Sequence, residues 1–436
     1  MQMTTNVRWT AAWLLSALTA FAACGGEPAP PPAATRTEPT PIALAVAGRL
    51  NASASVAAFG QMVAAVWTAS VDDTSDIYCS VSLDGGKTFA APARVNDLDG
   101  DARASGEQAA RVAIGTGNVI HVAWPARRDG RSLIRYAASQ DGGRTFSSAV
   151  TVAGDVSPGL RGWQALTLGY DGSVQVIWLD GRHADPAVHR RGHPHAKPGV
   201  RRPAAGAAPR QDIFHAALSQ SGRGDGARSE RLVQENVCFC CKTAVATSGE
   251  NVYAAWRHIF PGSMRDIAVA HSIDNGVTFG NPIRVSEDGW KIDACPDDGP
   301  AMVADGHGGI HIAWPTLVAG DTPRKGIFYS TLTGGAFAPR LRLDAGDADP
   351  AHPQIASDVH TNTAVAWDER AGETRRVVFR PVSDGKPLPP QFFSGDGVGY
   401  PVVAGGEGYW IVLWSVQGDG DRSIIEGRRI PSTATP

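Results

Sequence analysis

Seven short apolar runs, each closing with a tryptophan, recur along this chain. They are Val63–Trp67, Val119–Trp124, Val174–Trp178, Val252–Trp256, Ile310–Trp314, Thr363–Trp367 and Trp410–Trp414. The gaps between closing tryptophans run from 47 residues (367 to 414) to 78 residues (178 to 256). Short strands repeating at this interval are typical of one four-stranded sheet per repeat. The pattern predicts an all-β chain, a β-propeller of four-stranded blades. Seven blades are expected, with six as the alternative.

The second repeat displays the expected unit most completely. Its four strands are predicted at Ala109–Ile114, Val119–Trp124, Leu133–Ser139 and Ala149–Val152. The last repeat stops after its third strand, near Ile424–Arg428. The segment Pro41–Ala47 resembles the fourth strand of the second repeat, so we expect it to pair into the last blade. This pairing would close the ring and remove open sheet edges, giving a propeller domain over residues 41–431.

A second repeated pattern follows the apolar run in three repeats. It reads Ser-x-Asp-x-Gly-x-Thr-Phe at Ser82–Phe89, Ser139–Phe146 and Ser272–Phe279. Ser and Asp side chains bind nearby backbone amides, and Gly takes a positive φ, so the pattern predicts a tight turn between two strands. The motif positions are Ser82, Asp84, Gly86, Phe89, Ser139, Asp141, Gly143, Phe146, Ser272, Asp274, Gly276 and Phe279.

This motif resembles the Asp box of sialidases and other proteins with bacterial neuraminidase repeats, which are β-propellers. The resemblance implies the architecture across nearly the whole chain. It implies no activity, because the box is a structural turn away from the reaction site. True sialidases have six blades, so a count of seven departs from the family pattern.

The N-terminal residues indicate export rather than part of the fold. Arg8 precedes the apolar stretch Trp9–Ala23, which is too short for a spanning helix. Ala22-Ala23-Cys24-Gly25 resembles a bacterial lipobox, which implies a signal peptide over residues 1–23 and a lipid anchor on Cys24. Phe21 is less usual in that motif, so a plain signal peptide is the alternative. Residues 24–40 are rich in Pro and Ala, as in an extended tether.

The resemblance to a lipoprotein implies a protein of the bacterial cell envelope. Gly25 and Gly26 lack the Asp that favours retention in the inner membrane, so we expect an outer-membrane anchor, facing the periplasm or the surface. The membrane partner is then the lipid anchor alone. The net charge of −3 gives no reason to expect nucleic acid as a partner. Export also implies an oxidising compartment, where paired cysteines persist.

Four cysteines are expected to meet where two neighbouring repeats begin. Cys238, Cys240 and Cys241 precede the first strand of the fourth repeat, and Cys295 precedes that of the fifth; His258 follows on the same face. Three interpretations stay open. The cysteines form one or two disulfides, they bind copper or zinc together with His258, or Cys240 and Cys241 form a strained vicinal disulfide.

A sialidase needs three arginines for a carboxylate, a Tyr nucleophile with a Glu partner, and an Asp acid/base. Candidates near the channel mouth are Tyr400, Glu235, Glu107 and the arginines that follow the closing tryptophans: Arg127, Arg128, Arg182, Arg257 and Arg370. The Arg-Ile-Pro signature of the family is absent before the first Asp box, so the catalytic set stays unassigned.

Three functions are therefore compared. The main hypothesis is a binding or metal-handling module at the cysteine-rich mouth. The first alternative is an exo-acting glycoside hydrolase of sialidase type. The second is a scaffold that binds a glycan or an envelope protein.

Overall fold

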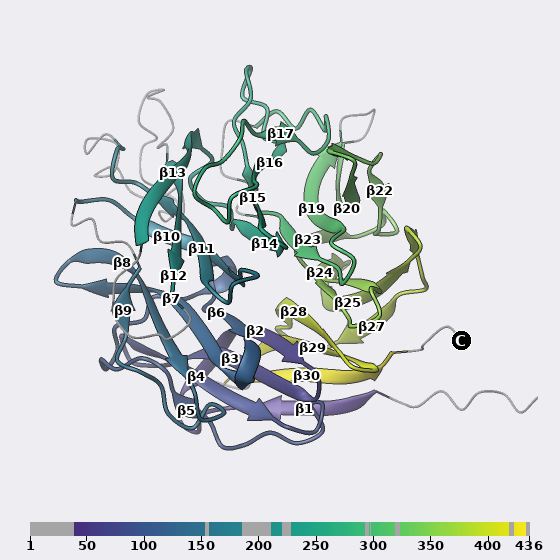
Figure 1. Cartoon of the computed structure of the whole chain (residues 1–436). Helices are drawn as coiled ribbons and strands as arrows, with labels where there is room; N and C mark the ends of the chain where they lie inside the picture. The colour runs from purple at the N-terminus through teal and green to yellow at the C-terminus, as the bar shows by residue number, and fades with distance from the viewer. Residues whose placement is uncertain are drawn as a thin grey trace, which may run out of the picture. The chain divides into compact units, whose positions relative to one another are not determined.

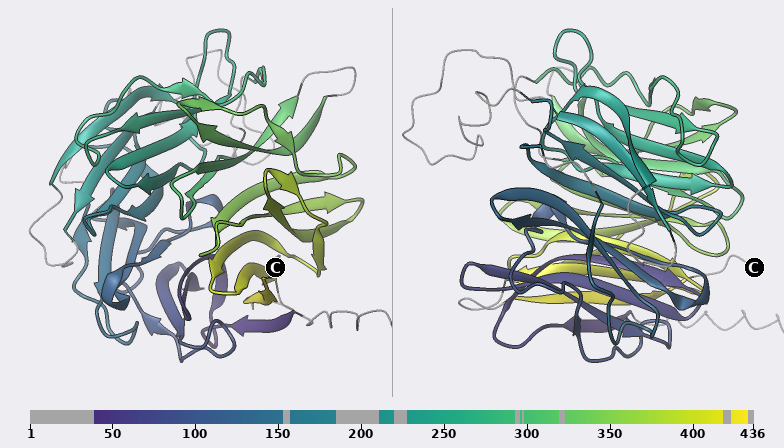
Figure 2. Two further views of the ribbon diagram at one scale, coloured as in Figure 1. Left: turned by 45° about the vertical axis from the view of Figure 1, so that its right-hand side comes forward. Right: turned by 60° about the vertical axis from the view of Figure 1, so that its left-hand side comes forward.

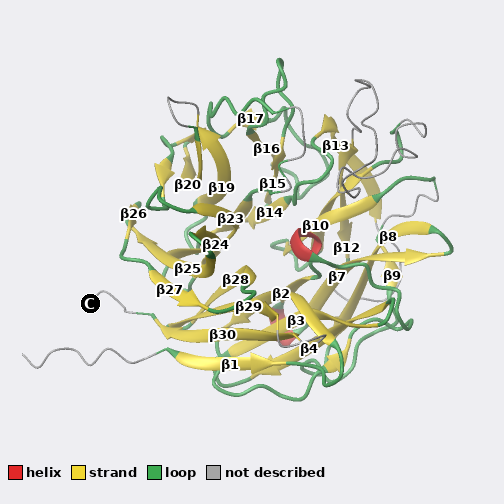
Figure 3. Cartoon of the chain, turned by 180° about the vertical axis from the view of Figure 1, so that it is seen from behind, coloured by secondary structure: helices red, strands yellow, loops and turns green. Residues whose placement is uncertain are grey.

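The computed structural model describes residues 39–152, 157–184, 211–219, 228–292, 296, 298–318, 323–417 and 423–432. These residues lie within one compact unit, Glu38–Pro436. Strands and loops make up nearly all of it, with two short 3-10 turns at Gly106–Gln108 and Thr116–Asn118 (Figure 1, Figure 3). The predicted signal peptide, Cys24 and Cys295 lie outside the described residues.

Antiparallel sheets of four strands are the repeating unit. Three sheets contain four strands each: β6 to β9 (Arg111–Ile114, Ile120–Arg128, Arg131–Ser139, Val150–Thr151), β10 to β13 (Arg161–Leu168, Val174–Asp180, Gln211–Leu218, Arg228–Val237), and β14 to β17 (Ala244–Ser248, Asn251–Arg257, Ile267–Ser272, Ile283–Arg284). The four strands of the second repeat thus lie where the sequence predicts them, within a few residues at each end.

Two further sheets carry an extra short strand beside their third strand. One is β18 to β21 (Ala301–Ala304, Ile310–Val318, Arg324–Thr333, Ala336–Phe337) with β22 (Leu341–Arg342). The other is β23 to β26 (Asp349–Ser357, Thr363–Ala371, Thr374–Ser383, Lys386–Pro387) with β27 (Gln391–Ser394).

The remaining strands form one eight-stranded sheet from both ends of the described chain. It contains β1 to β5 (Thr40–Leu44, Leu50–Phe59, Met62–Val71, Thr74–Ser82, Ala93–Arg94) and β28 to β30 (Gly399–Gly406, Tyr409–Gln417, Ser423–Pro431). β1 pairs antiparallel with β30, and β2 meets β30 at a single parallel pair, Leu50 with Ser423. Figure 1 shows purple β1 beside yellow β30.

The last strand is longer than the sequence suggested. β30 pairs with β29 along its whole length, ending at the pair Tyr409–Pro431. The segment Arg429–Pro431 is therefore part of the strand and does not follow it. β1 adds a further ladder on the other side of β30, reaching Arg429.

The core lies between neighbouring sheets. The seven closing tryptophans are all at most 2% exposed. Each packs with apolar side chains of its own sheet and of an adjacent one: Trp124 shares a cluster with β3 and β4 residues, and Trp178 with residues of β8. Such burial stabilises by roughly 25 cal/mol per Å² of apolar surface, so the tryptophan repeat fixes how the sheets stack.

Seven strands surround one cavity of about 410 Å³. β2, β6, β10, β14, β18, β23 and β28 each contribute three consecutive residues to its lining. These residues are mostly Ala, Val, Ile and Leu. Figure 2 shows the sheets arranged around this common centre. None of the described residues forms a helix long and apolar enough to cross a membrane.

The three Ser-x-Asp turns have the same hydrogen bonds. Ser139 Oγ donates to Asp141 Oδ1 at 2.8 Å and accepts from Gly143 N at 2.8 Å, while Thr145 Oγ1 donates to Asp141 Oδ2 at 2.6 Å. Equivalent bonds occur in the turns at Ser82 and Ser272. The hydrogen bonds from Thr145 and Ser139 lower the pKa of Asp141 to about 2. All these bonds stay inside the turn, as expected of a structural device.

Candidate functional site

Four of the innermost strands begin with the same irregularity. The pairing of β2, β10, β23 and β28 with the following strand shifts register near the strand start. The bulged residues Ser53, Trp163, His352 and Tyr400 have φ of 56°, 52°, 56° and 53°. This backbone costs a non-glycine residue about 1–3 kcal/mol and is concentrated at functional sites, and bulges re-aim side chains. The face on which these strands begin is therefore the candidate functional face.

Buried charges join three sheets beside these bulges. Lys242 precedes β14 and donates a hydrogen bond from Nζ to Glu107 Oε1 at 2.9 Å. Its Nζ also lies 4.0 Å from Oδ1 of Asp298, which precedes β18. Glu107 lies in the 3-10 turn before β6, and all three side chains are buried. We call Glu107, Lys242 and Asp298 the mouth cluster.

Every charge of the mouth cluster has a partner. Glu107 Oε2 accepts a hydrogen bond from the Gly299 amide at 3.3 Å. Asp298 Oδ2 accepts from the His352 amide at 3.0 Å and lies 3.7 Å from Lys325 Nζ. Burial raises the pKa of Glu107, although the charge of Lys242 opposes this. A buried cluster of this kind is a structural tie between sheets, although Asp298 Oδ1 accepts no hydrogen bond from the described residues.

His352 and Tyr400 form a second pair on this face. Their rings stack with centroids 4.1 Å apart, and Asp368 Oδ2 binds both His352 Nδ1 at 2.9 Å and the Tyr400 amide at 2.7 Å. Burial disfavours a charged imidazole, but the hydrogen bond to Asp368 and the charges of Asp298 and Glu107 outweigh it and raise the pKa of His352. The hydrogen bond and charge of His352, together with the charge of Arg375, lower the pKa of Asp368 despite its burial. The Tyr400 ring is held against the His352 imidazole.

A hollow on this face lies between the sheet of β6 to β9 and the sheet of β10 to β13. It is a cleft of about 800 Å³, within the size range of ligand sites. Its described lining includes Trp163 and no acidic side chain. Five arginines line it: Arg103, Arg127, Arg131, Arg161 and Arg182. We call this hollow the arginine cleft.

A hairpin positions the exposed arginines of the cleft. β7 and β8 are joined by Asp129 and Gly130, which have φ of 50° and 75°. A two-residue Asp-Gly connection with both φ positive matches the twist of the flanking strands. Arg127 and Arg131 flank this turn, and both are exposed. Arg103 is tied to the same hairpin by its amide, which donates to Pro125 O at 2.8 Å.

The other two arginines of the cleft are locked into its wall. Asp180 binds Arg161 Nε at 3.0 Å, Arg182 Nη2 at 2.6 Å and Trp178 Nε1 at 2.9 Å. Arg182 also pairs with Glu230. These hydrogen bonds lower the pKa of Asp180 against the effect of burial. Arg161 and Arg182 thus act as a rigid wall, whereas Arg103, Arg127 and Arg131 have no acidic partner among the described residues.

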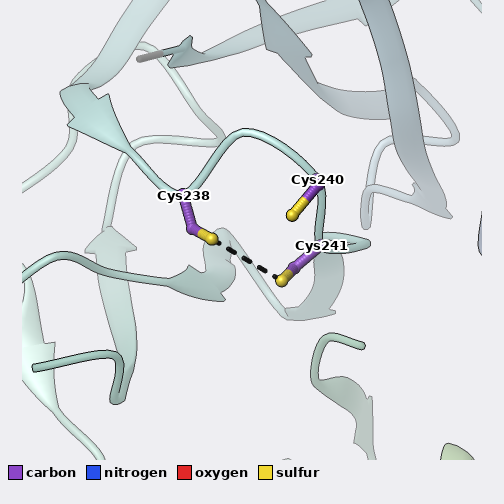
Figure 4. A group of neighbouring side chains, drawn as sticks. All are labelled: Cys238, Cys240 and Cys241. Carbon is purple, nitrogen blue, oxygen red and sulfur yellow. Dashed lines mark hydrogen bonds between the residues drawn. The ribbon is translucent and has the colours of Figure 1, made fainter. Parts of the chain in front are cut away.

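Three of the four predicted cysteines form a buried group before β14. The sulfurs of Cys238, Cys240 and Cys241 lie within 4.8 Å of one another (Figure 4). Cys238 and Cys241 are free thiols 3.7 Å apart. The hydrogen bond from Cys241, with the charges of Arg265 and Arg257, lowers the pKa of Cys238 to about 7 despite burial. Burial and Cys238 raise the pKa of Cys241 well above the usual thiol value.

The other predicted metal ligand, His258, binds a neighbour. Its Nδ1 accepts a hydrogen bond from Trp256 Nε1 at 3.2 Å, and burial lowers its pKa. Cys79 is a buried free thiol, and burial raises its pKa to about 12.

The predicted sialidase candidates lie in different surroundings. Arg257 is buried and donates to three backbone carbonyls, those of Asp298, Arg265 and Pro315. Glu235 and Arg370 are exposed, on β13 and β24. Tyr400 is 37% exposed and stacks on His352. Among the described residues, hydrogen bonds do not join these side chains around one reaction site.

Sequence reasoning missed two pairs of residues on this face. Lys242 and Asp298 received no role, because they lie 56 residues apart (242 to 298) and meet only through tertiary packing. Arg103 and Arg131 received none either. In the sequence, arginines stand on both sides of the Asp129-Gly130 turn. This pattern predicts a charged hairpin tip, but it does not predict which part of the fold the tip faces.

No protein-family model matches this sequence, and no curated protein matches it. Among solved structures, it resembles the alpha-L-arabinofuranosidase Arb93A from Fusarium graminearum at 12% identity, covering 92% of this chain and 99% of that one, with a TM-score of 0.51. It also resembles the polysaccharide lyase Uly1 at 12% identity, covering 89% and 91%, with a TM-score of 0.50.

A sialidase is among the similar structures too. The NanB sialidase from Streptococcus pneumoniae has 12% identity over 85% of this chain and 84% of that one, with a TM-score of 0.44, which carries no argument. At these identities the likenesses show the fold alone: an all-β arrangement of four-stranded sheets, as in glycosidase-type β-propellers.

Proposed function

We propose that this domain binds an acidic glycan, a saccharide bearing carboxylate or sulfate groups, in the arginine cleft. One observation carries the proposal. Arg103, Arg127 and Arg131 present three guanidinium groups to a cleft of about 800 Å³ with no acidic partner among the described residues. Guanidinium groups bind planar anions through paired hydrogen bonds.

The distribution of charge supports an anionic ligand. The chain as a whole has a net charge of −3, so the five arginines of the cleft are a local excess of positive charge on a weakly acidic protein. A cleft lined by one sign of charge concentrates ligands of the opposite sign. Arg161 and Arg182 are neutralised by Asp180 and Glu230, and they keep the wall rigid while the three exposed arginines meet the ligand.

Binding fits the described residues better than hydrolysis. A glycosidase normally needs two carboxyl groups at the scissile bond. The described lining of the cleft contains none, and the carboxylates of Glu107 and Asp298 are buried against Lys242. We therefore place the protein in the glycan-binding class and keep exo-acting hydrolysis as the alternative that the same experiment tests.

The test is calorimetric titration with four oligosaccharides. Oligogalacturonate carries carboxylates, a heparin oligosaccharide carries sulfates, sialyllactose carries one carboxylate, and maltohexaose is neutral. We expect an acidic probe to bind and maltohexaose not to bind. Each guanidinium contact is worth about 1.5–3 kcal/mol, so Arg127→Ala and Arg131→Ala should each weaken binding by at least about tenfold.

A matched control keeps this test specific. Arg370 is exposed and lies outside the cleft, so Arg370→Ala should leave affinity unchanged. Equal binding of neutral and acidic probes, or equal loss in all three variants, would contradict the proposal. Release of sialic acid by wild type, abolished in Tyr400→Phe, would replace it with the hydrolase alternative.

We also propose that the ring has seven blades and is closed by the N-terminal strand. The support is the pairing of β1 with β30 and the seven strands that line the central cavity. Deleting residues 39–47 would remove β1 and expose the edge of β30, so we expect a lower melting temperature and self-association. An unchanged melting temperature in a monomeric deletion variant would argue against closure by this strand.

The export of the protein and its anchor at Cys24 remain proposals as well, because residues 1–38 are not described. Mass spectrometry of the membrane fraction tests them directly. Diacylglyceryl on an N-terminal Cys24 is the expected result, and a soluble protein that retains its full N-terminus would overturn it.

A further inference from the structure

Two buried thiols face each other at the start of β14. The sulfurs of Cys238 and Cys241 lie 3.7 Å apart, and both residues are about 2% exposed. Two sulfurs at this separation can share one ion through bonds of about 2.3 Å. Both side chains come from one short loop, so they can adjust together around an ion (Figure 4).

Two buried guanidinium groups lie beside these thiols without a carboxylate partner. Arg257 is 1% exposed and donates only to backbone carbonyls. Arg265 is 2% exposed; its Nε donates to Ile292 O at 3.3 Å, and its Nη1 has no hydrogen-bond partner. Buried charges in proteins are normally paired, so we expect an anion close to these two guanidinium groups.

The carboxylates around this site are already engaged. Asp266 pairs with Arg284, and Asp298 pairs with Lys242 and Lys325. Among the described residues, the sulfurs of Cys238 and Cys241 can carry negative charge next to Arg257 and Arg265, and the charges of both arginines act on Cys238.

We propose that Cys238 and Cys241 bind one copper(I) ion as a bis-thiolate. Each thiol gives up its proton to solvent as a sulfur–metal bond forms. The product, one ion of charge +1 between two thiolates, has a net charge of −1. Arg257 and Arg265 then offset this charge within the buried site, which gives the unpaired Nη1 of Arg265 an anion to face.

The donor set selects the class of metal. Thiolates are preferred by soft ions such as copper(I), whereas structural zinc takes four ligands. Among the described residues, the cluster contains three sulfurs and no His, Asp or Glu. Cys240 is not a free thiol, and the Nδ1 atom of His258 accepts a hydrogen bond from Trp256. Two free thiols suit copper(I) and leave zinc short of ligands.

The test is an anaerobic competition titration of the intact protein with copper(I) and bicinchoninate. We expect one copper(I) per chain in wild type and none at that affinity in Cys238→Ser or Cys241→Ser. Cys79→Ser is the matched control, since Cys79 is also a buried free thiol, and it should retain the ion. Loss of binding in all three variants, or no binding by folded wild type, would overturn the proposal.

Two further measurements guard against misfolded variants. X-ray absorption of the copper-loaded wild type should show a shell of sulfur atoms only, and nitrogen or oxygen ligands would contradict the assignment. Arg265→Gln keeps both thiols but removes a charge, so we expect copper affinity to fall about tenfold while the circular dichroism spectrum stays unchanged. An affinity equal to wild type would remove the electrostatic part of the argument.

Discussion

The mouth cluster and the arginine cleft both collect charged side chains on one face, but in opposite states. In the mouth cluster, Lys242 is buried and bound to Glu107 and Asp298. In the cleft, Arg127 and Arg131 are exposed and have no acidic partner among the described residues. Buried, satisfied charges hold sheets together, whereas exposed, unsatisfied ones remain available for a ligand. Whether a charged side chain has a partner, more than its presence alone, therefore distinguishes a structural role from a role in ligand binding.

The strongest test of this comparison removes the cation of the mouth cluster. Lys242→Met leaves Glu107 as a buried acid without its cation and leaves Asp298 paired with Lys325 alone, which costs about 3–5 kcal/mol of unfolding free energy. Urea denaturation measures it. The double variant Glu107→Gln with Lys242→Met should recover part of the loss, and both should keep glycan affinity once folded. A loss below about 1 kcal/mol would show that the cluster does not tie the sheets.

A second test converts satisfied arginines into unsatisfied ones. Asp180→Asn keeps an acceptor for Trp178 Nε1 but removes the counter-charge of Arg161 and Arg182. We expect unfolding free energy to fall by about 1.5–3 kcal/mol. We also expect an acidic oligosaccharide to bind more tightly, because the guanidinium charge of Arg161 becomes available in the cleft while Arg182 keeps its pair with Glu230. Weaker binding instead would mean that wall rigidity matters more than available charge.

The pH dependence of stability sharpens the picture near the mouth cluster. The pKa of His352 is raised above its ordinary value of 6.5. Its contribution to stability is therefore fully present below pH 6.5 and is lost as pH rises through the folded-state pKa. His352→Asn removes the titrating group and tolerates the positive φ. The difference in melting temperature between wild type and His352→Asn should shrink with rising pH above 6.5; a constant difference would contradict the prediction.

The smallest expected effect is the response of the cleft to salt. The Debye length falls from about 10 Å at 0.1 M to about 3 Å at 1 M salt, so affinity for an acidic oligosaccharide should fall over this range. Arg127→Lys keeps the charge but loses the planar fork, so it should keep the salt dependence at reduced affinity. Arg127→Ala should reduce both. A salt-independent affinity would move recognition to uncharged contacts.

Much of the fold could be predicted because its signals are local. The tryptophan that ends each run predicts a buried strand, and Ser139 and Asp141 predict a turn that is complete within eight residues. The pairing of Pro41–Ala47 with the last repeat needed only an internal comparison. The end of β30 lies beyond the predicted Arg428, because β29 pairs with it as far as Pro431 and β1 as far as Arg429.

The candidate site could be predicted only in part, because its chemistry depends on which partners meet. Glu107 and Lys242 are 135 residues apart in the chain, and no local pattern reveals their contact. From the sequence, Arg257 is a candidate for binding a ligand carboxylate, but its guanidinium group donates hydrogen bonds to three backbone carbonyl oxygens. The left-handed backbone at Trp163 and Tyr400 is also invisible from residue type, since neither favours it.

The pairing of β1 with β30 also governs the order in which the molecule can assemble. During synthesis, β1 finds its partner only when β30 has been made, and the hydrogen bond from Asn51 to Ser423 O joins residues 372 positions apart. Contacts between such distant residues slow folding, and until they form, β1 is a free edge in a half-built protein. A chaperone that covers this segment during synthesis or export would have a defined window in which to act.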